Sequence, residues 1–364
     1  MQTMQTMQST QNIYKPKHFP VNNTKLLFFD IFYKNNKIYM IMPIYNTPAS
    51  PQSITVTINN NVIPIKESHV KDSDEPILVY IYEYITPPNS IVKVNVNIID
   101  NDIKSYELTH VCIDAHTHTH THTHTHTHRR ATNNFLALTT LLKHDYHLFP
   151  LFYNYYKEQG VDHFFMYYNG VITPQISKIF NKPDVTLVQW DFHYWNPPGV
   201  KYVHHAQMGQ MHHALYKYGK DIYDYMIFCD MDEYLHVSKN KFIECIASNG
   251  SIYINNTLKS FIKHNLNIDI FGFCNMWADT IDGNIPNTSH LPKKFLSVTE
   301  PVEYRERSKN IYKVSSINTI GIHQTGNDFF STFKYITDLK MYHFYKWSSK
   351  IRTIKGCTNI VELD

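Results

Sequence analysis

A short apolar run is followed at once by three acidic residues, in YMIFCDMDE over residues 225–233. The apolar part predicts a buried strand, whereas aspartate is a poor strand former and is costly to bury as an unpaired carboxylate. Asp230 and Asp232 are two positions apart, so in an extended turn both carboxylates can converge on one divalent cation. Oxygen ligands of this kind favour Mg²⁺ or Mn²⁺. The run therefore predicts a metal site, with a capped turn of solvated acids as the simpler alternative.

Strand-end aspartates that bind a metal occur in more than one class of enzyme, including phosphatases and nucleases. A metal-dependent phosphohydrolase is therefore an alternative interpretation of Asp230 and Asp232. Such an enzyme would need further metal ligands at other strand ends, and the three strands predicted before residue 223 supply few.

Apolar runs and helical patterns alternate after Arg130. Strands are predicted at 135–142, 161–168, 185–190 and 223–229, and helices at 147–159, 172–180 and 203–218. This alternation predicts an α/β catalytic domain over residues 131–364, with a mostly parallel, Rossmann-like sheet flanked by helices. Ligands in such sheets bind at the carboxyl ends of the strands, which is where the acidic run lies.

The N-terminal third has a different pattern. Val92, Val94, Val96 and Ile98 alternate with polar residues, which is typical of a half-buried strand. Similar runs at 26–33, 38–44, 53–58 and 77–84, separated by turn residues, predict a small all-β, sandwich-like accessory domain over residues 25–114. Residues 1–24 are predicted to be a disordered tail, and the strict His-Thr alternation of residues 115–130 a low-complexity linker.

Composition excludes several classes of protein. The chain has 364 residues and a net charge of +3, whereas a dedicated nucleic-acid-binding protein would carry a basic stripe. Five widely spaced cysteines without a CxxC pair predict neither a disulfide framework nor a structural zinc site. The sequence contains no apolar run of membrane-spanning length and no signal-peptide pattern, so we expect a cytoplasmic protein without a membrane span. The sequence does not indicate an oligomeric state.

A series of short motifs in the C-terminal part resembles, in order and spacing, the landmarks of glycosyltransferase family 92, also known as the domain of unknown function 23 group. The resemblance covers roughly residues 135–350, and the first 130 residues match no family motif. The landmarks are LKHD at 142–145, YY at 155–156, GVDHF at 160–164, Trp190, Gln210, FCDMDEYL at 228–235, FG at 271–272, RSKNIY at 307–312, His323 and YHF at 342–344.

This resemblance implies a GT-A fold, a nucleotide-sugar donor that is UDP-linked, a divalent metal (Mn²⁺ or Mg²⁺) and inversion at the anomeric carbon. The acceptor would be a glycan or a protein-linked glycan. The chain departs from the family pattern in two respects. Cellular members are commonly anchored by an N-terminal membrane segment, which this sequence lacks, and Asp145 stands where glutamate is more usual. The lack of a membrane segment, together with the abundance of Ile, Asn, Lys and Tyr, favours an origin in a large DNA virus or a protist parasite. The protein would then act in the host-cell cytoplasm or be carried in a virion.

The resemblance also implies roles on the donor side. Asp230 would face the ribose and Asp232 the metal. From its place at the end of the first predicted strand, Asp145 is expected to meet the uracil or ribose, with a cap on the following helix as the alternative. The basic residues Arg307, Lys309 and Lys313 are expected to pair with the diphosphate, with a solvated basic strand as the alternative for Lys313, and Lys309 also matches the family.

The third metal ligand and the acceptor side leave alternatives open. His323 matches a family histidine and is the expected third metal ligand, with His343 as the competing choice. An inverting transferase needs a base for the acceptor hydroxyl, and Asp279 and Asp282 are the candidates, with Asp279 preferred. A third class, a non-catalytic carbohydrate-binding or structural protein with a vestigial transferase domain, is disfavoured by the intact pair of aspartates.

Overall fold

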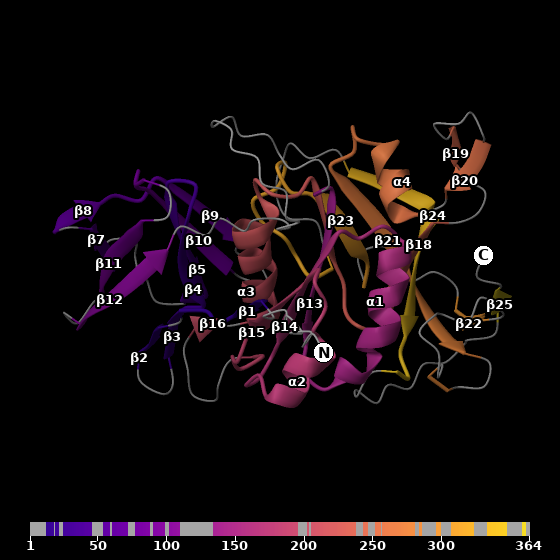
Figure 1. The fold of residues 1–364 in the computed structure, drawn as a ribbon, viewed down its shortest axis with the longest axis horizontal. Helices are drawn as coiled ribbons and strands as arrows, with labels where there is room; N and C mark the ends of the chain where they lie inside the picture. The colour runs from indigo at the N-terminus through magenta and orange to yellow at the C-terminus, as the bar shows by residue number, and fades with distance from the viewer. Residues whose placement is uncertain are drawn as a thin grey trace, which may run out of the picture.

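The fold was analysed in a computed structural model, shown as a ribbon in Figure 1. The predicted His-Thr linker and Asp282 lie outside the residues that the structure describes. The described residues are 12–17, 19–21, 25–45, 54–58, 60–71, 77–87, 90–98, 102–109, 134–195, 202–203, 205–237, 243–246, 252–255, 257–280, 284–285, 296–299, 307–323, 333–347 and 359–361.

An eleven-stranded sheet forms the centre of the C-terminal part, in the order β1-β15-β14-β13-β17-β23-β21-β22-β25, with β24 paired to β21 and β18 to β24. The strands are β1 (Asn12–Tyr14), β13 (Leu136–Leu142), β14 (His163–Tyr168), β15 (Val185–Gln189), β17 (Tyr225–Phe228), β18 (Glu233–Val237), β21 (Ile270–Thr280), β22 (Leu296–Val298), β23 (Lys309–Lys313), β24 (Phe333–Phe344) and β25 (Asn359–Val361).

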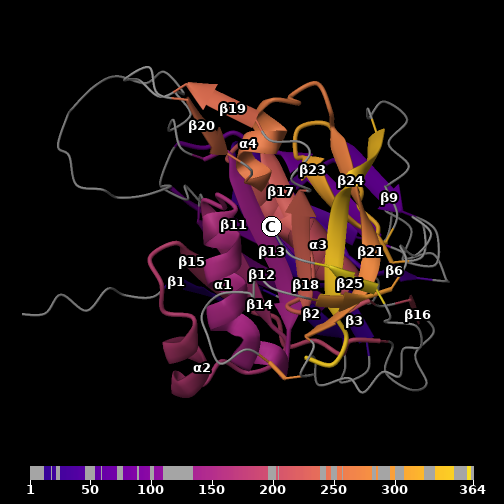
Figure 2. The ribbon, with the colours of Figure 1, turned by 90° about the vertical axis from the view of Figure 1, so that its right-hand side faces the viewer.

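The sheet is mixed, where we expected a mostly parallel one. Strands β1 to β17 of this order pair in parallel, whereas β23 pairs antiparallel with both β17 and β21. Beyond β17, antiparallel pairing needs no crossover helix. Figure 2 shows the C-terminal strands β18, β24 and β21 side by side.

Helices cover both faces of the parallel half. Phe164 and Met166 of β14 pack in the same buried cluster as α1 (Phe149–Glu158). Their neighbours Phe165 and Tyr167 pack with α3 (Ala206–His213), which continues as a π-helical segment over Ala214–Gly219. Strands buried on both faces read as continuous apolar runs, which explains the sequences of β13 and β14. The remaining helices are α2 (Pro174–Ile179), α4 (Leu258–Lys263) and a 3₁₀ turn over Asp145–Leu148.

The strand order fixes where a ligand can bind. Strands β13, β14, β15 and β17 lie in the order β15-β14-β13-β17, so the chain reverses direction across the central sheet between β13 and β17. In open α/β sheets the crevice at such a reversal is the ligand site. The fold therefore brings the residues after Leu142 next to those after Phe228.

Two four-stranded antiparallel sheets form most of the N-terminal part, in the orders β4-β5-β10-β9 and β12-β11-β7-β8. They share one buried cluster, to which the first sheet contributes Tyr33 and Met40 and the second Val56 and Val94. Their strands are β4 (Asp30–Lys34), β5 (Lys37–Met42), β7 (Ile54–Ile58), β8 (Asn61–Ile63), β9 (Glu67–Lys71), β10 (Ile77–Glu83), β11 (Ile91–Ile98) and β12 (Asp102–Thr109).

Three two-stranded pairs complete the described elements: β2 (Phe19–Val21) with β3 (Lys25–Phe28), β6 (Ile44–Tyr45) with β16 (Tyr202–Val203), and β19 (Ile243–Ile246) with β20 (Ile252–Asn255). The described helices include none with the length and hydropathy of a membrane span.

The segment predicted to be a disordered tail contributes β1 to the edge of the central sheet. Residues 12–14 pair in parallel with Thr186, Leu187 and Val188 of β15. A sheet edge offers unpaired backbone N–H and C=O groups, so a short segment without a strand pattern of its own can be ordered by pairing there. The prediction for residues 1–24 missed this tertiary contribution.

The N-terminal part packs against α3. Phe29 stacks on Trp190 with 5.6 Å between ring centroids. Its ring approaches Gly209 of α3 so closely that a Cβ at that position would lie 2.6 Å from it. Glycine is therefore required at residue 209 for this contact. Figure 1 shows α3 between the N-terminal strands and the central sheet.

A buried carboxylate lies at the same contact. Asp30 is fully buried, and its Oδ2 accepts from the Tyr14 hydroxyl at 2.7 Å and lies 2.8 Å from His213 Nε2. Because a carboxylate only accepts, His213 donates from Nε2 and its Nδ1 accepts from the Tyr167 hydroxyl at 2.6 Å. Burial raises the pKa of Asp30, but Lys217, at 3.6 Å, and His213 outweigh burial and bring the pKa below its ordinary value. Asp30 therefore ties β4 to α3 as a charged group.

We expect Asp30→Ala to lower the free energy of unfolding by about 3–5 kcal/mol, because it leaves Lys217 buried without its counter-charge. Urea unfolding measures the change. Glu107→Ala is the control, since it removes an ion pair with Lys93 whose side chains are both more than half exposed, and should change the same quantity by less than about 1 kcal/mol. Equal effects of the two variants would contradict the role given to Asp30.

Candidate active site

The acidic turn follows β17 directly and leads into β18. Glu233 closes the turn: its Oε2 accepts a hydrogen bond of 2.7 Å from the Asp230 backbone N–H, and its own N–H donates to the Asp230 carbonyl at 3.2 Å. Glu233 is buried, whereas the Asp230 side chain is 37% exposed. The third acid of the run therefore holds the turn and leaves Asp230 accessible.

Lys309 joins this turn to β23. Its Nζ lies 3.2 Å from Asp230 Oδ2 and 3.4 Å from Glu233 Oε2, and its side chain is 3% exposed. Because β23 pairs antiparallel with β17, with Asn310 opposite Phe228, Lys309 is carried to the level of the turn. The ammonium that we expected on a donor diphosphate thus lies on two carboxylates of the protein, and its contact with a diphosphate stays a prediction.

Burial is the largest influence on the pKa values of these three groups and acts against each charged form. At Lys309 the carboxylates of Asp230 and Glu233 outweigh burial and raise the pKa. At Asp230 the charges of Lys309 and His343 outweigh it and lower the pKa. At Glu233 burial prevails over Lys309, and with the charge of Asp230 it raises the pKa to about 7. Lys309 and Asp230 therefore form the charged pair of the turn.

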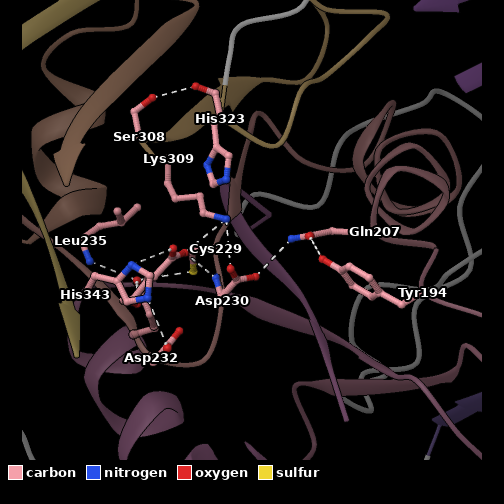
Figure 3. Close-up of polar contacts among 12 residues, drawn as sticks. Tyr194, Gln207, Cys229, Asp230, Asp232, Leu235, Ser308, Lys309, His323 and His343 are labelled. Carbon is pink, nitrogen blue, oxygen red and sulfur yellow. Dashed lines mark hydrogen bonds and ion pairs between the residues drawn. The ribbon is translucent and has the colours of Figure 1, made fainter. Parts of the chain in front are cut away.

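Asp232 lies against the C-terminal strands (Figure 3). Its Oδ2 is 3.3 Å from His343 Nε2, and the other ring nitrogen of His343 is 3.6 Å from Glu233 Oε1. The pairing of β18 with β24 sets Glu233 opposite His343, and β21 places Trp277 on the other side, with ring centroids 4.4 Å apart. Three strands therefore position His343 beside Asp232.

A cavity of about 760 Å³ opens over the turn. Its size lies within the range of about 300–1,000 Å³ typical of small-molecule sites. Asp230 and Asp232 line it together with residues that follow β13, β14 and β15. Asp145 is among them, at the start of the 3₁₀ turn after β13, and its contact with a donor base or ribose stays a prediction. Among the described residues, the cavity is lined by Leu141, Leu142, Lys143, His144, Asp145, Asn169, Asp191, Phe192, His193, Tyr194, Trp195, Gln207, Asp230, Met231 and Asp232.

His323 and Arg307 lie near the ends of the segment that carries Lys309. The His323 carbonyl accepts from Ser308 Oγ at 2.8 Å, and its ring lies beside the ammonium of Lys309 in Figure 3. Burial, and then the charge of Lys309, lower the pKa of His323 to about 4. The guanidinium of Arg307 lies 5.4 Å from the centroid of the Trp277 ring. Of the two histidines considered as metal ligands, His343 is the one that contacts Asp232.

Of the two candidate bases, the structure describes Asp279 but not Asp282. Asp279 lies near the end of β21, two residues beyond Trp277, and its side chain is 8% exposed. Its Oδ2 pairs with Lys346 Nζ, while its Oδ1 has no hydrogen-bond partner among the described residues. Asp279 does not belong to the described lining of the 760 Å³ cavity. Asp282 falls outside the described residues.

The side chains of the turn fit a divalent cation that takes some of its ligands from the protein and the others from a substrate. In the part of the chain that the structure describes, no three His, Cys, Asp or Glu side chains form a metal-binding cluster. Asp232 Oδ2 and His343 Nε2 are 3.3 Å apart, and adjacent ligands of an octahedral ion bound at about 2.1 Å lie about 3 Å apart. Mg²⁺ commonly takes one or two carboxylates and completes its shell with water and substrate phosphates.

Gln207 is a cavity-lining residue in contact with Asp230 that we did not single out in the sequence. Its Nε2 donates to Asp230 Oδ1 at 3.2 Å, and its Oε1 accepts from the Tyr194 hydroxyl at 2.6 Å. Gln210, which we singled out instead, donates to Thr139 Oγ1 at 2.7 Å and so holds α3 on β13. The two glutamines are three residues apart and share a helix face, and that polar pair on a buried helix was the available signal.

Comparisons with known proteins agree with the resemblance noted above. A model of the family described as Glycosyltransferase family 92 matches residues 139–362, more than half of the chain. The matched segment starts within β13 and contains the acidic turn, Lys309, His323 and His343. A search of the curated proteins finds no match.

Proposed function

The chain belongs to glycosyltransferase family 92, and from this premise we propose that it transfers a sugar from a UDP-linked donor to a glycan or protein-linked glycan. We propose that transfer depends on a divalent metal and inverts the anomeric carbon. The observation that carries the proposal is the position of Asp230 and Asp232, which follow a parallel strand at the reversal of the sheet and line a cavity of about 760 Å³. The same strand order, with helices on both faces, supports a GT-A fold.

The cavity offers groups for the nucleotide half of the donor. Asp145 presents a carboxylate at the end of β13, suited to accept hydrogen bonds from a base or ribose. Trp195 presents an aromatic side chain that is 62% exposed. Arg307 and Lys309 lie on the side of the turn and are proposed to meet the diphosphate.

Asp232 and His343 are proposed to hold Mn²⁺ or Mg²⁺, with Asp230 beside them. We propose His343 in place of the expected His323, because the Nε2 atom of His343 lies 3.3 Å from Asp232 Oδ2. The bound ion would neutralise charge on the diphosphate leaving group. Lys309 balances the charge of Asp230, so the turn keeps one uncompensated carboxylate, that of Asp232, for the cation.

Inversion requires one group that removes the proton of the acceptor hydroxyl. We propose Asp279, with Asp282 as the second candidate. Lys346 pairs with one oxygen of Asp279, and the other is buried and has no hydrogen-bond partner among the described residues. Trp277, two residues earlier on β21 and in ring contact with His343, is proposed to contact the transferred sugar or the acceptor.

With Mn²⁺ present, UDP should raise the melting temperature of the protein, and the matching UDP-sugar should raise it further. A ligand that binds only the folded state at a hundredfold excess over Kd stabilises it by about 2.7 kcal/mol. UMP should act much less because it lacks the second phosphate for the metal, and EDTA should abolish the shift.

Differential scanning fluorimetry measures this response for UDP, GDP and their sugars. Phosphate release from simple esters without a UDP response would favour a phosphohydrolase. A protein that responds to no nucleotide at millimolar ligand and Mn²⁺ would refute the proposed donor and favour a vestigial domain.

A further inference from the structure

Gln207 occupies a defined place between the wall of the cavity and the acidic turn. It is the second residue of α3, and its backbone N–H donates to His205 Nδ1 at 3.3 Å, which caps the helix. Its side chain is 8% exposed and lines the cavity. A buried amide at the first turn of a helix, directed at a carboxylate, has a fixed position that an exposed glutamine would lack.

The orientation of this amide follows from its two partners (Figure 3). An ionised carboxylate only accepts hydrogen bonds, so the Nε2 group must face Asp230 and the Oε1 atom must face Tyr194. The two distances, 3.2 Å to Asp230 Oδ1 and 2.6 Å from the Tyr194 hydroxyl, agree with this arrangement. The hydrogen bonds therefore run in one direction: the Tyr194 hydroxyl donates to the Gln207 amide, which donates to the Asp230 carboxylate.

Asp230 is thereby held by two donors of different charge. Gln207 takes Oδ1, and Lys309 takes Oδ2 at 3.2 Å. A second ammonium in place of the amide would make the surroundings of Asp230 positive and oppose a nearby cation. The glutamine supplies a hydrogen bond without adding charge, so it fixes the carboxylate and leaves the site attractive to a cation.

The same helix end also anchors the aromatic wall of the cavity. The Tyr194 carbonyl accepts from the Ala206 N–H at 3.0 Å. The Trp195 ring lies 5.6 Å from that of Tyr194 and 4.1 Å from that of His205, measured between centroids. A ligand that contacts Trp195 therefore packs against a segment that is hydrogen-bonded to Gln207 through Tyr194.

We propose that Gln207 is a positioning residue that orients Asp230 and fixes its position relative to the aromatic wall formed by Tyr194 and Trp195. A donor that binds against this wall then meets a carboxylate that is already oriented. This inference rests on the proposed function, because it assumes a nucleotide-sugar in the cavity. It assigns to Gln207 a contribution to donor binding and not to folding.

The test compares Gln207→Met, Gln207→Glu, Tyr194→Phe and the double variant Tyr194→Phe/Gln207→Met at pH 8. The readouts are the affinity for UDP with Mn²⁺ by isothermal titration calorimetry and the melting temperature without ligand. We expect Gln207→Met to weaken UDP binding about tenfold, since one hydrogen bond to a charged group is lost. Gln207→Glu should weaken binding more, because an isosteric carboxylate would repel Asp230. Tyr194→Phe should weaken it less, and the double variant should resemble Gln207→Met alone.

A residue that only fills space would give the opposite order, with the isosteric Gln207→Glu nearest to wild type, and that order overturns the proposal. Additive effects of Tyr194→Phe and Gln207→Met overturn the link to the wall. Gln175→Met, on the exposed side of α2, is the matched control and should bind UDP as the wild type does. If the wild-type protein itself binds no UDP with Mn²⁺, the proposed function fails; if it binds and the Gln207 variants bind equally well, only this inference fails.

Discussion

Asp232→Asn should lower kcat/KM for sugar transfer by about 30- to 1,000-fold, equivalent to about 2–4 kcal/mol of transition-state stabilisation supplied through the metal. Asparagine keeps the volume of the side chain and an oxygen that can face His343, so the melting temperature without ligand should hardly change. The loss should be accompanied by weaker binding of UDP in Mn²⁺, because the substitution removes the one carboxylate of the turn that no lysine balances. Transfer assays and calorimetry with UDP and Mn²⁺ measure the two effects.

Two histidine variants distinguish whether His343 or His323 is the histidine ligand of the proposed metal site. His343→Gln should reproduce the loss of Mn²⁺-dependent UDP binding, whereas His323→Gln should retain most of it, since His343 Nε2 is the atom that lies 3.3 Å from Asp232. Asp221→Asn is the control for removal of an aspartate charge, because this exposed side chain pairs with Lys34 at the end of the π-helical segment. An Asp232→Asn variant with unchanged metal dependence would refute the metal site, and the reverse order of the histidines would restore His323.

The elements of the parallel half of the central sheet could be predicted from the sequence because their signals are local. β13 and β14 are apolar runs buried on both faces, and α1 has apolar residues at helical spacing with a proline in its first turn. The position of Asp230 and Asp232 at a strand end follows from the same patterns. These features need no knowledge of distant residues, so periodicity and turn chemistry are sufficient.

The contacts that define the site could not be predicted, because they join residues far apart in the sequence. Lys309 reaches Asp230 only through the antiparallel pairing of β23 with β17, and His343 reaches Asp232 only through β24. Strand β1 likewise exists through its pairing with β15. Such pairings depend on sheet order, which local patterns do not specify. The resemblance pointed to Lys309 as a diphosphate ligand, and only the fold shows its pairing with Asp230.

Among single substitutions in this turn, we expect Lys309→Met to lower the free energy of unfolding the most, by about 3–5 kcal/mol. The ammonium is buried and contacts both Asp230 and Glu233, so its removal leaves the Asp230 carboxylate without its counter-charge, beside the buried carboxyl group of Glu233. UDP binding should also fall, because Asp230 would then be held by Gln207 alone. Urea unfolding and calorimetry with UDP and Mn²⁺ measure the two losses separately.

The double variant Lys309→Met/Glu233→Gln separates the structural contribution of Lys309 from its functional one. A glutamine at residue 233 retains an oxygen for the Asp230 backbone N–H but removes the buried charge, so the double variant should be more stable than Lys309→Met. Its UDP affinity should stay as low as that of Lys309→Met, because nothing replaces the donor on Asp230 Oδ2. Recovery of binding along with stability would mean that Lys309 only compensates buried charge, and a single variant as stable as the wild type would show that the Lys309 pairs do not hold the turn. The expected split, with stability regained and binding still lost, would assign Lys309 to the orientation of Asp230 as well as to the fold.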